Sequence, residues 1–307
     1  MVFLNVLCSG VIFAEPFNAA LVSSEAGWVL HADYDAFRQT ALASGLRAKL
    51  DQRGLEQKME IFRRIFSFHP IDDVRSVLIY GTDTDPNNAT VLITARFDKD
   101  ALLTLLEKPK TFAHNQHTIH SWESRHGHRK GQREYGAFYG QDRIVMAATM
   151  EKVKKVLDIL DGKEANASGN SLMPSAKPVQ GRFLYVQADS LGKLVENNPS
   201  TVMLRQTGRL LLTVSENNGV LEIRADMAVP STQKVAEIEQ VLRGILAYGQ
   251  LATEQKKPSL ASLISAVRIE PGQNVLSVIF SYDSKELTEL LDKVAPKDIE
   301  QVKISAR

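Results

Sequence analysis

The sequence predicts an α+β protein made of two tandem copies of a β-α-β-β-α-β-β-α unit, with antiparallel sheets and helices packed on one face. Three observations lead to this prediction. Short strands rich in β-branched residues alternate with amphipathic helices along the chain. A segment of small residues and proline divides the 307 residues near the middle. The order of elements after this segment repeats the order before it.

The first copy is expected at residues 21–162. Its strands are expected at residues 28–34, 76–81, 89–97, 118–124, 134–140 and 143–149. Its helices are expected at residues 37–50, 55–66, 98–108 and 150–162. Asp35 is placed to cap the first helix, and Gly162 is placed to end the last one.

Residues 163–180 are small, polar and twice interrupted by proline, which is typical of a linker. The second copy is then expected at residues 181–307. Its opening stretch, GRFLYVQADSL, aligns with GWVLHADYDAF of the first copy, so that Asp189 takes the place of the capping Asp35. The pattern leaves open whether the two sheets join into one.

The first residues have the features of an export signal. No charged residue precedes Glu15, and the apolar run has the length of a signal-peptide core. A run this short cannot cross a bilayer, so no transmembrane span is expected. The prediction is a signal peptide in residues 1–20, truncated because no basic residue opens it, and a periplasmic or secreted mature protein. An apolar N-terminal strand is the alternative.

The overall composition limits the partners of the protein. Hydrophobic residues make up 44% of the chain and charged residues 24%, as in globular proteins. The formal net charge is +1, which excludes a whole-protein field that would attract nucleic acid, so no specific nucleic-acid partner is expected. Cys8 is the only cysteine, and a mature chain without it holds no disulfide.

Several phrases of the chain resemble a family of uncharacterised exported bacterial proteins. The phrases are GWVLHADYDAF, DDVRSVLIYGTD, TVLITARFD, HTIHSW, YGAFYGQDRIVMAAT and VLDILDG. The resemblance covers most of residues 27–295 and implies export and the duplicated α+β layout. Its motifs are strands and turns, so it implies no catalytic or binding residue.

The stretch HNQHTIHSWESRHGHRK, residues 114–130, holds five of the seven histidines. Imidazole groups bind zinc or copper where three or four ligands meet. His117 and His120 face opposite sides if this part is a strand, whereas His126 and His128 flank a glycine in the following loop. These four histidines are the candidate metal ligands, and no other cofactor is expected.

The same hairpin carries a basic tip. Its cations are Arg125, Arg129, Lys130 and Arg133, with no acidic residue between the first and the last. Such a tip is a candidate site for an anionic ligand, whose binding would weaken with salt. The alternative is a solvated loop. The second copy has no counterpart of this hairpin, which favours a role of its own.

No catalytic motif is found: the chain contains neither a G-x-S-x-G elbow nor a glycine-rich phosphate loop. The function predicted is therefore a non-enzymatic binding or scaffold protein of the cell envelope. Its partner is expected to be an envelope protein or an anionic ligand. The alternatives are a metal-binding protein that uses the histidine stretch and an enzyme with a site between the two copies.

Overall fold

The computed structural model describes residues 17–52, 54–83, 85, 88–124, 130–169, 179–190, 207–254 and 258–294. Strands account for much of this part of the chain. Those of the first half are β1 (Trp28–Asp33), β2 (Val74–Gly81), β3 (Thr90–Ala95), β4 (Lys110–His114), β5 (His117–Glu123), β6 (Arg133–Tyr139) and β7 (Arg143–Ala147). Those of the second half are β8 (Arg182–Ala188), β9 (Leu210–Asn217), β10 (Val220–Ala228), β11 (Val267–Pro271) and β12 (Val275–Asp283).

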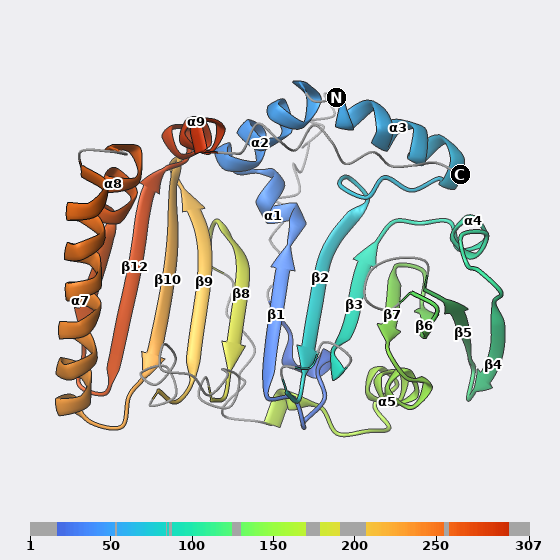
Figure 1. Cartoon of the computed structure of the whole chain (residues 1–307). Helices are drawn as coiled ribbons and strands as arrows, with labels where there is room; N and C mark the ends of the chain where they lie inside the picture. The colour runs from blue at the N-terminus through green and yellow to red at the C-terminus, as the bar shows by residue number, and fades with distance from the viewer. Residues whose placement is uncertain are drawn as a thin grey trace, which may run out of the picture.

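These strands form a single antiparallel sheet (Figure 1). Its order is β11-β12-β10-β9-β8-β1-β2-β3-β7-β6-β5-β4. Strand β1 pairs with β2 on one side and with β8 on the other, so the two halves share one sheet. The predicted α+β class with antiparallel strands is confirmed.

Eight α-helices and two 3-10 turns are found among the described residues. The helices are α1 (Tyr34–Arg38), α2 (Ala41–Gln52), α3 (Leu55–Phe66), α4 (Lys99–Leu103), α5 (Met150–Leu160), α7 (Thr232–Glu254), α8 (Pro258–Ser265) and α9 (Ser284–Val294). The turns are η1 (Ala19–Leu21) and η4 (Ala167–Gly169). Helices α1, α2, α3 and α9 follow one edge of the sheet, at the strand ends (Figure 1). None of the described helices is long and apolar enough to cross a membrane.

Side chains at the helix ends explain where the helices begin and stop. Asp33, the last residue of β1, caps α1 by accepting a hydrogen bond from the amide of Ala36 at 2.8 Å. The expected cap, Asp35, is instead paired with Arg38. At the end of α5, Gly162 adopts a φ of +74° and stops the helix as predicted.

The apolar core divides between the two faces of the sheet. On one face of the first half, α5 and η1 pack over β1, β2, β3, β7 and β6. On the opposite face of the second half, α7 packs over β10, β11 and β12. Successive side chains of a strand point to opposite faces, and β9 follows this rule: Leu210 packs against the α7 core and Leu211 against the α5 core. The prediction that helices pack on one face is therefore wrong, because both faces carry helices.

The ends of the first half are part of its core. Phe17, 1% exposed, stacks on Tyr185 of β8 with the ring centroids 5.0 Å apart. Within the segment expected as a linker, the amide of Ala167 donates to the carbonyl of Val22 at 2.9 Å, and Ala167 is fully buried. Residues 1–16 and 170–178, which include most of the expected signal peptide and half of the expected linker, lie outside the described residues.

Candidate ligand-binding site

The histidine stretch lies on β4, β5 and the loop that follows β5. His114 and His117 are cross-strand partners on neighbouring strands. The Nε2 atom of His114 lies 3.0 Å from both carboxylate oxygens of Asp158, and that of His117 lies 3.1 Å from both oxygens of Asp161. Each imidazole thus has its own carboxylate partner at the end of α5. These two pairs hold the outer hairpin against the helix.

His120 lies on the other face of the sheet. It follows His117 by three positions, so strand alternation directs the two side chains to opposite sides. Its ring lies edge-on to Phe138 at a centroid distance of 5.9 Å, and burial lowers its pKa below the ordinary value. His117 and His120 are therefore not brought together as ligands of one ion. His126 and His128 lie outside the described residues.

The basic tip can be placed only in part. Arg125 and Arg129 lie outside the described residues, and Lys130 is exposed at a turn. Arg133 begins β6, where its guanidinium donates to Ser121 Oγ at 3.5 Å and to the carbonyl of residue 108 at 3.3 Å. Arg133 thus braces the base of the hairpin. The anion-binding role of the tip stays a prediction.

An apolar pocket of about 170 Å³ lies between α4 and the sheet, at a place that the sequence did not indicate. Its cover is made of leucines of α4 and the turn after it: Leu102, Leu103, Leu105 and Leu106. Its floor is made of side chains and backbone of β5, β6 and β7: His120, Trp122, Gly136, Ala137, Phe138, Ile144 and Met146. Ten of these eleven lining residues are apolar, and His120 is the exception.

A glycine beneath a tryptophan ring shapes the floor of the pocket. A Cβ atom at Gly136 would lie 2.8 Å from the carbonyl oxygen of Val145 and 3.1 Å from the Trp122 ring. Both distances are closer than ordinary van der Waals contact, so glycine is needed for the indole to lie across β6. The indole Nε1 then donates to Glu134 Oε2 at 3.1 Å, which fixes the ring.

The chemistry of this pocket suits binding. A cavity of about 150 Å³ with an apolar lining stays dry and takes up a benzene-sized molecule. Pockets for complete small ligands are usually larger, about 300–1,000 Å³. A 170 Å³ pocket is therefore large enough for the apolar end of a ligand. The ammonium group of Lys99 lies 5.9 Å from the centroid of the Phe138 ring, which places one cation beside the lining.

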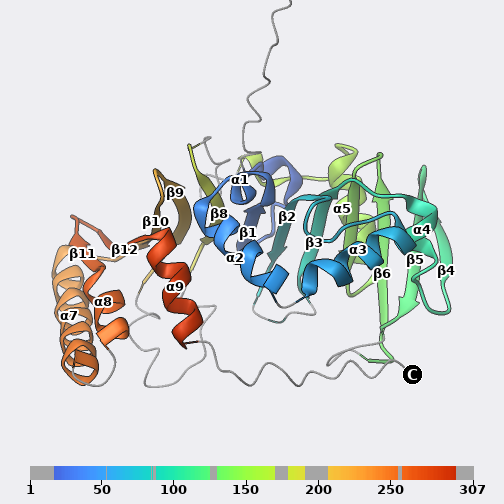
Figure 2. The same cartoon turned by 90° about the horizontal axis from the view of Figure 1, so that it is seen from above.

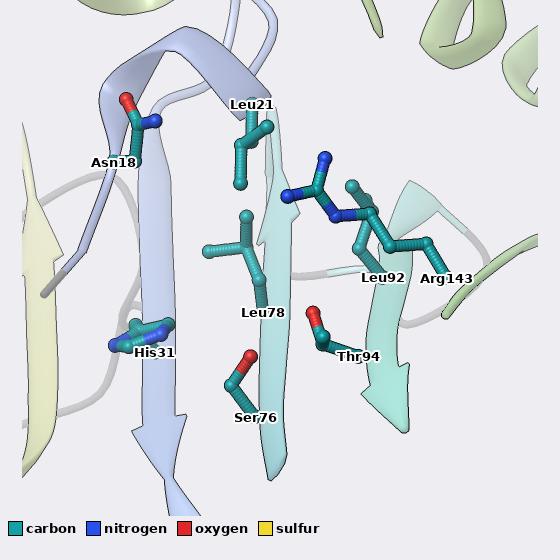
Figure 3. A pocket seen from close by; sticks show the side chains of 8 residues that line it. All are labelled: Asn18, Leu21, His31, Ser76, Leu78, Leu92, Thr94 and Arg143. Carbon is teal, nitrogen blue, oxygen red and sulfur yellow. The ribbon is translucent and has the colours of Figure 1, made fainter. Parts of the chain in front are cut away.

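A second cavity lies on the opposite face, between η1 and strands β1, β2, β3 and β7 (Figure 3). It is lined by Asn18, Leu21, His31, Ser76, Leu78, Leu92, Thr94 and Arg143. Its volume of about 10 Å³ is that of a single water. Burial, together with the positive charge of Arg182, lowers the pKa of His31 to about 4. This cavity is a small gap in a polar part of the core and is too small for a ligand.

Comparisons with known proteins found only distant similarity. No family model matches the chain, and no curated protein matches it. Among solved structures the chain is similar to crystal forms I, III and IV of TP0453, an exported protein of Treponema, at 10% identity in each case. The TM-scores are 0.46, 0.47 and 0.46, with 90%, 91% and 91% of this chain and 96%, 98% and 96% of those chains covered. A TM-score below 0.5 carries no argument about function.

Proposed function

We propose that this protein is an exported, non-enzymatic binding protein that holds the apolar part of an amphipathic ligand in the pocket under α4. The observation that carries the proposal is the pocket itself, with its volume of about 170 Å³ and ten apolar lining residues. Burial of an apolar group there contributes about 25 cal/mol per Å² of surface removed from water. The proposal thus adds a ligand class, amphipathic molecules, to the predicted binding role in the cell envelope.

We also propose that the two halves are copies of one unit. Outward from β1, the neighbouring strands are β2, β3, β7 and β6. Outward from β8, they are β9, β10, β12 and β11. In the first half, the third strand along the chain, β3, pairs with β7, the last strand before α5. In the second half, the third strand, β10, pairs with β12, the last strand before α9. This shared order supports a duplication, as do the aligned phrases at the start of each half.

The proposed duplication supports the interpretation of the pocket as a binding site rather than as a gap left by loose packing. Helices α4 and α7 both follow the third strand of their half and pack on the same face of the sheet. Helix α7 has 23 residues and fills this face with Val235 and Ile238, which are 1% and 5% exposed. Helix α4 has 5 residues and leaves the pocket open. Figure 2 shows the two helices at opposite ends of the sheet.

The ligand class follows from the groups around the pocket. The lining takes a hydrocarbon chain, and Lys99 beside Phe138 can pair with a negatively charged head group. A long-chain fatty acid has both parts and is the probe of choice. The histidine stretch has less support as a metal site, because His114 and His117 already have carboxylate partners and His120 lies on the other face.

The test is a binding titration with a fluorescent long-chain fatty acid. Wild type is expected to bind it saturably. Met146→Trp fills the floor of the pocket and is expected to weaken binding at least about tenfold, which is about 1.4 kcal/mol. Leu103→Arg, which places a charge in the cover without altering the sheet, is expected to do the same.

The control is Val220→Trp, an apolar residue of β10 that is 44% exposed and lies in the other half. It adds the same indole away from the pocket, so its affinity is expected to equal that of wild type. Equal affinity in all the variants, or no saturable binding by wild type, would overturn the proposal.

A further inference from the structure

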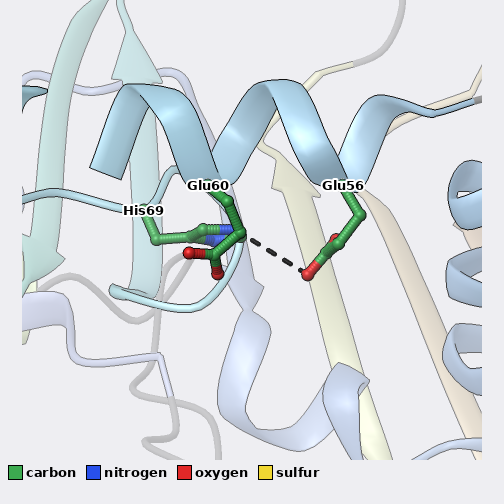
Figure 4. Close-up of side chains that lie close together, drawn as sticks. All are labelled: Glu56, Glu60 and His69. Atoms are coloured by element: carbon green, nitrogen blue, oxygen red, sulfur yellow. Dashed lines mark ion pairs between the residues drawn. The ribbon is translucent and has the colours of Figure 1, made fainter. Parts of the chain in front are cut away.

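Two carboxylates and a buried imidazole meet under helix α3 (Figure 4). Glu56 and Glu60 are four positions apart on α3, so their side chains share one face of the helix. His69 lies in the segment between α3 and β2, and its ring lies beneath this face. One ligand atom from each of the three residues lies within 4.8 Å of the other two.

The imidazole of His69 directs an atom without a partner at these carboxylates. The side chain is 0% exposed. Its Nδ1 accepts a hydrogen bond from the amide of Asp72 at 3.0 Å, whereas its Nε2 has no hydrogen-bond partner among the described residues. Nε2 lies 4.0 Å from Glu56 Oε1, and the buried Oε2 atom of Glu56 also lacks a partner there. Buried polar atoms nearly always have partners, so two such atoms in one cluster indicate a missing group.

The charges around the cluster favour a cation as this group. Arg47 pairs with Glu56 and Asp72, and Arg63 pairs with Glu60. Three carboxylates, those of Glu56, Glu60 and Asp72, therefore face two guanidinium groups, which leaves one negative charge beside the imidazole. Arg47 contacts Oε1 of Glu56 at 2.7 Å and leaves Oε2 for another partner.

Asp72 is placed to support a metal-bound histidine. Its Oδ2 atom lies 3.4 Å from His69 Nδ1. When Nε2 binds an ion, the ring proton lies on Nδ1, which then donates to this carboxylate instead of accepting from the Asp72 amide. Carboxylate–histidine–metal arrangements of this kind orient the ligand and raise its basicity.

We propose that Glu56, Glu60 and His69 bind one divalent transition-metal ion such as Zn²⁺. An imidazole with two carboxylates is a ligand set that zinc accepts, at bond lengths of about 2.0–2.2 Å. Ligand atoms around such an ion are roughly 3.4 Å apart, so the side chains close by about 1 Å on binding. The side chain of Glu60 is 33% exposed and has the freedom to do so. Three protein ligands leave the fourth position for water.

The experiment is a calorimetric titration of the full chain with Zn²⁺. Wild type is expected to bind one ion. Glu60→Gln keeps the shape of a half-buried side chain while removing its charge, and it is expected to weaken binding at least about tenfold. His69→Gln is expected to weaken binding as much. If this variant fails to fold because His69 is buried, Glu60→Gln alone tests the proposal. The control is the double variant His126→Ala/His128→Ala, which is expected to bind like wild type.

A second readout follows the proton on His69. In ¹⁵N NMR spectra, Zn²⁺ is expected to convert His69 from the form with Nδ1 unprotonated to the form with Nδ1 protonated. The proposal is overturned if wild type binds no zinc, if Glu60→Gln binds it like wild type, or if only the double variant loses binding. The last result would assign the metal to the histidine stretch instead.

Discussion

At the scale of single residues, His31 is, among the histidines that the structure describes, the one whose pKa is shifted most. It is 7% exposed in the middle of the sheet, and burial with the charge of Arg182 lowers its pKa from 6.5 to about 4. The unfolded chain therefore binds a proton between these two pH values that the folded protein does not bind. The contribution of His31 to stability is complete above about pH 6.5 and is lost as the pH falls towards 4.

We predict that this residue makes the protein sensitive to mild acid. Its contribution to the free energy of unfolding is expected to be about 2 kcal/mol smaller at pH 5 than at pH 7. In His31→Gln, which cannot be protonated, the loss between these pH values is expected to shrink by that amount. Urea denaturation of both proteins at both pH values measures it. An identical pH dependence of the two would show that His31 is not the group involved.

The roles of single residues could be predicted from the sequence only in part. Helix α5 ends at Leu160, just before Gly162 as expected, because a glycine after an amphipathic run has few other roles. The cap of α1 is Asp33 rather than Asp35, because β1 ends at Asp33, one residue earlier than its β-rich pattern suggested. The pair Glu56 and Glu60 was overlooked. Its only sequence signal is the i, i+4 spacing of two acids on a helix, which is common without any ligand.

At the scale of elements, the outer hairpin β4–β5 is tied to α5 by two histidine–carboxylate pairs. Strand β4 is the edge of the sheet, and most of its side chains are exposed. The partners Asp158 and Asp161 are spaced by three residues, so they face the hairpin together. Hydrogen bonds to charged groups contribute about 1.5–3 kcal/mol each. We infer that these pairs, rather than apolar contacts, hold β4 in place.

The double variant Asp158→Asn/Asp161→Asn is predicted to loosen this edge without unfolding the sheet. Amide hydrogen exchange in β4 is expected to become at least about tenfold faster, because local opening loses the charged partners. Exchange in β1 is expected to stay unchanged. Glu151→Gln is the control, since this α5 residue makes an exposed ion pair with Lys154. Unchanged exchange in β4 of the double variant would contradict this role.

The sequence predicted elements better where a periodic pattern was strong. Helix α3 has the expected bounds, because its apolar residues recur at helical spacing. Strand β4 was missed: it is exposed along four of five positions, so it has no alternating pattern to recognise. The helix expected over residues 37–50 is divided into α1 and α2, because the Thr40 hydroxyl accepts from the amide of Ala43 and starts a new helix.

At the scale of the whole molecule, function depends on which strands become neighbours. The pocket joins residues of four separate elements, α4, β5, β6 and β7. They meet because β7 inserts between β3 and β6. No local motif encodes that order, so the pocket could not be predicted from the sequence. The contrast between the short α4 and the long α7 appears only once both are seen on one face of the sheet.

Among the described residues, helix α7 offers another apolar surface to which a ligand could bind. Helix α7 exposes a stripe of apolar side chains along its outer side, in which Ile245, Tyr248 and Leu251 are 59%, 76% and 74% exposed. An apolar ligand that merely adheres to exposed hydrophobic surface would bind there. Helices α4 and α7 lie at opposite ends of the sheet (Figure 2), so a mapping experiment separates the pocket under α4 from this stripe.

The most direct test of the central claim is therefore a methyl NMR titration of the full chain with a long-chain fatty acid. We predict saturable shifts at Leu103, Ile144 and Met146, with Ile245 of α7 unaffected. Shifts confined to Ile245 and its neighbours, or none at the three pocket residues, would contradict the claim that the pocket under α4 is the binding site.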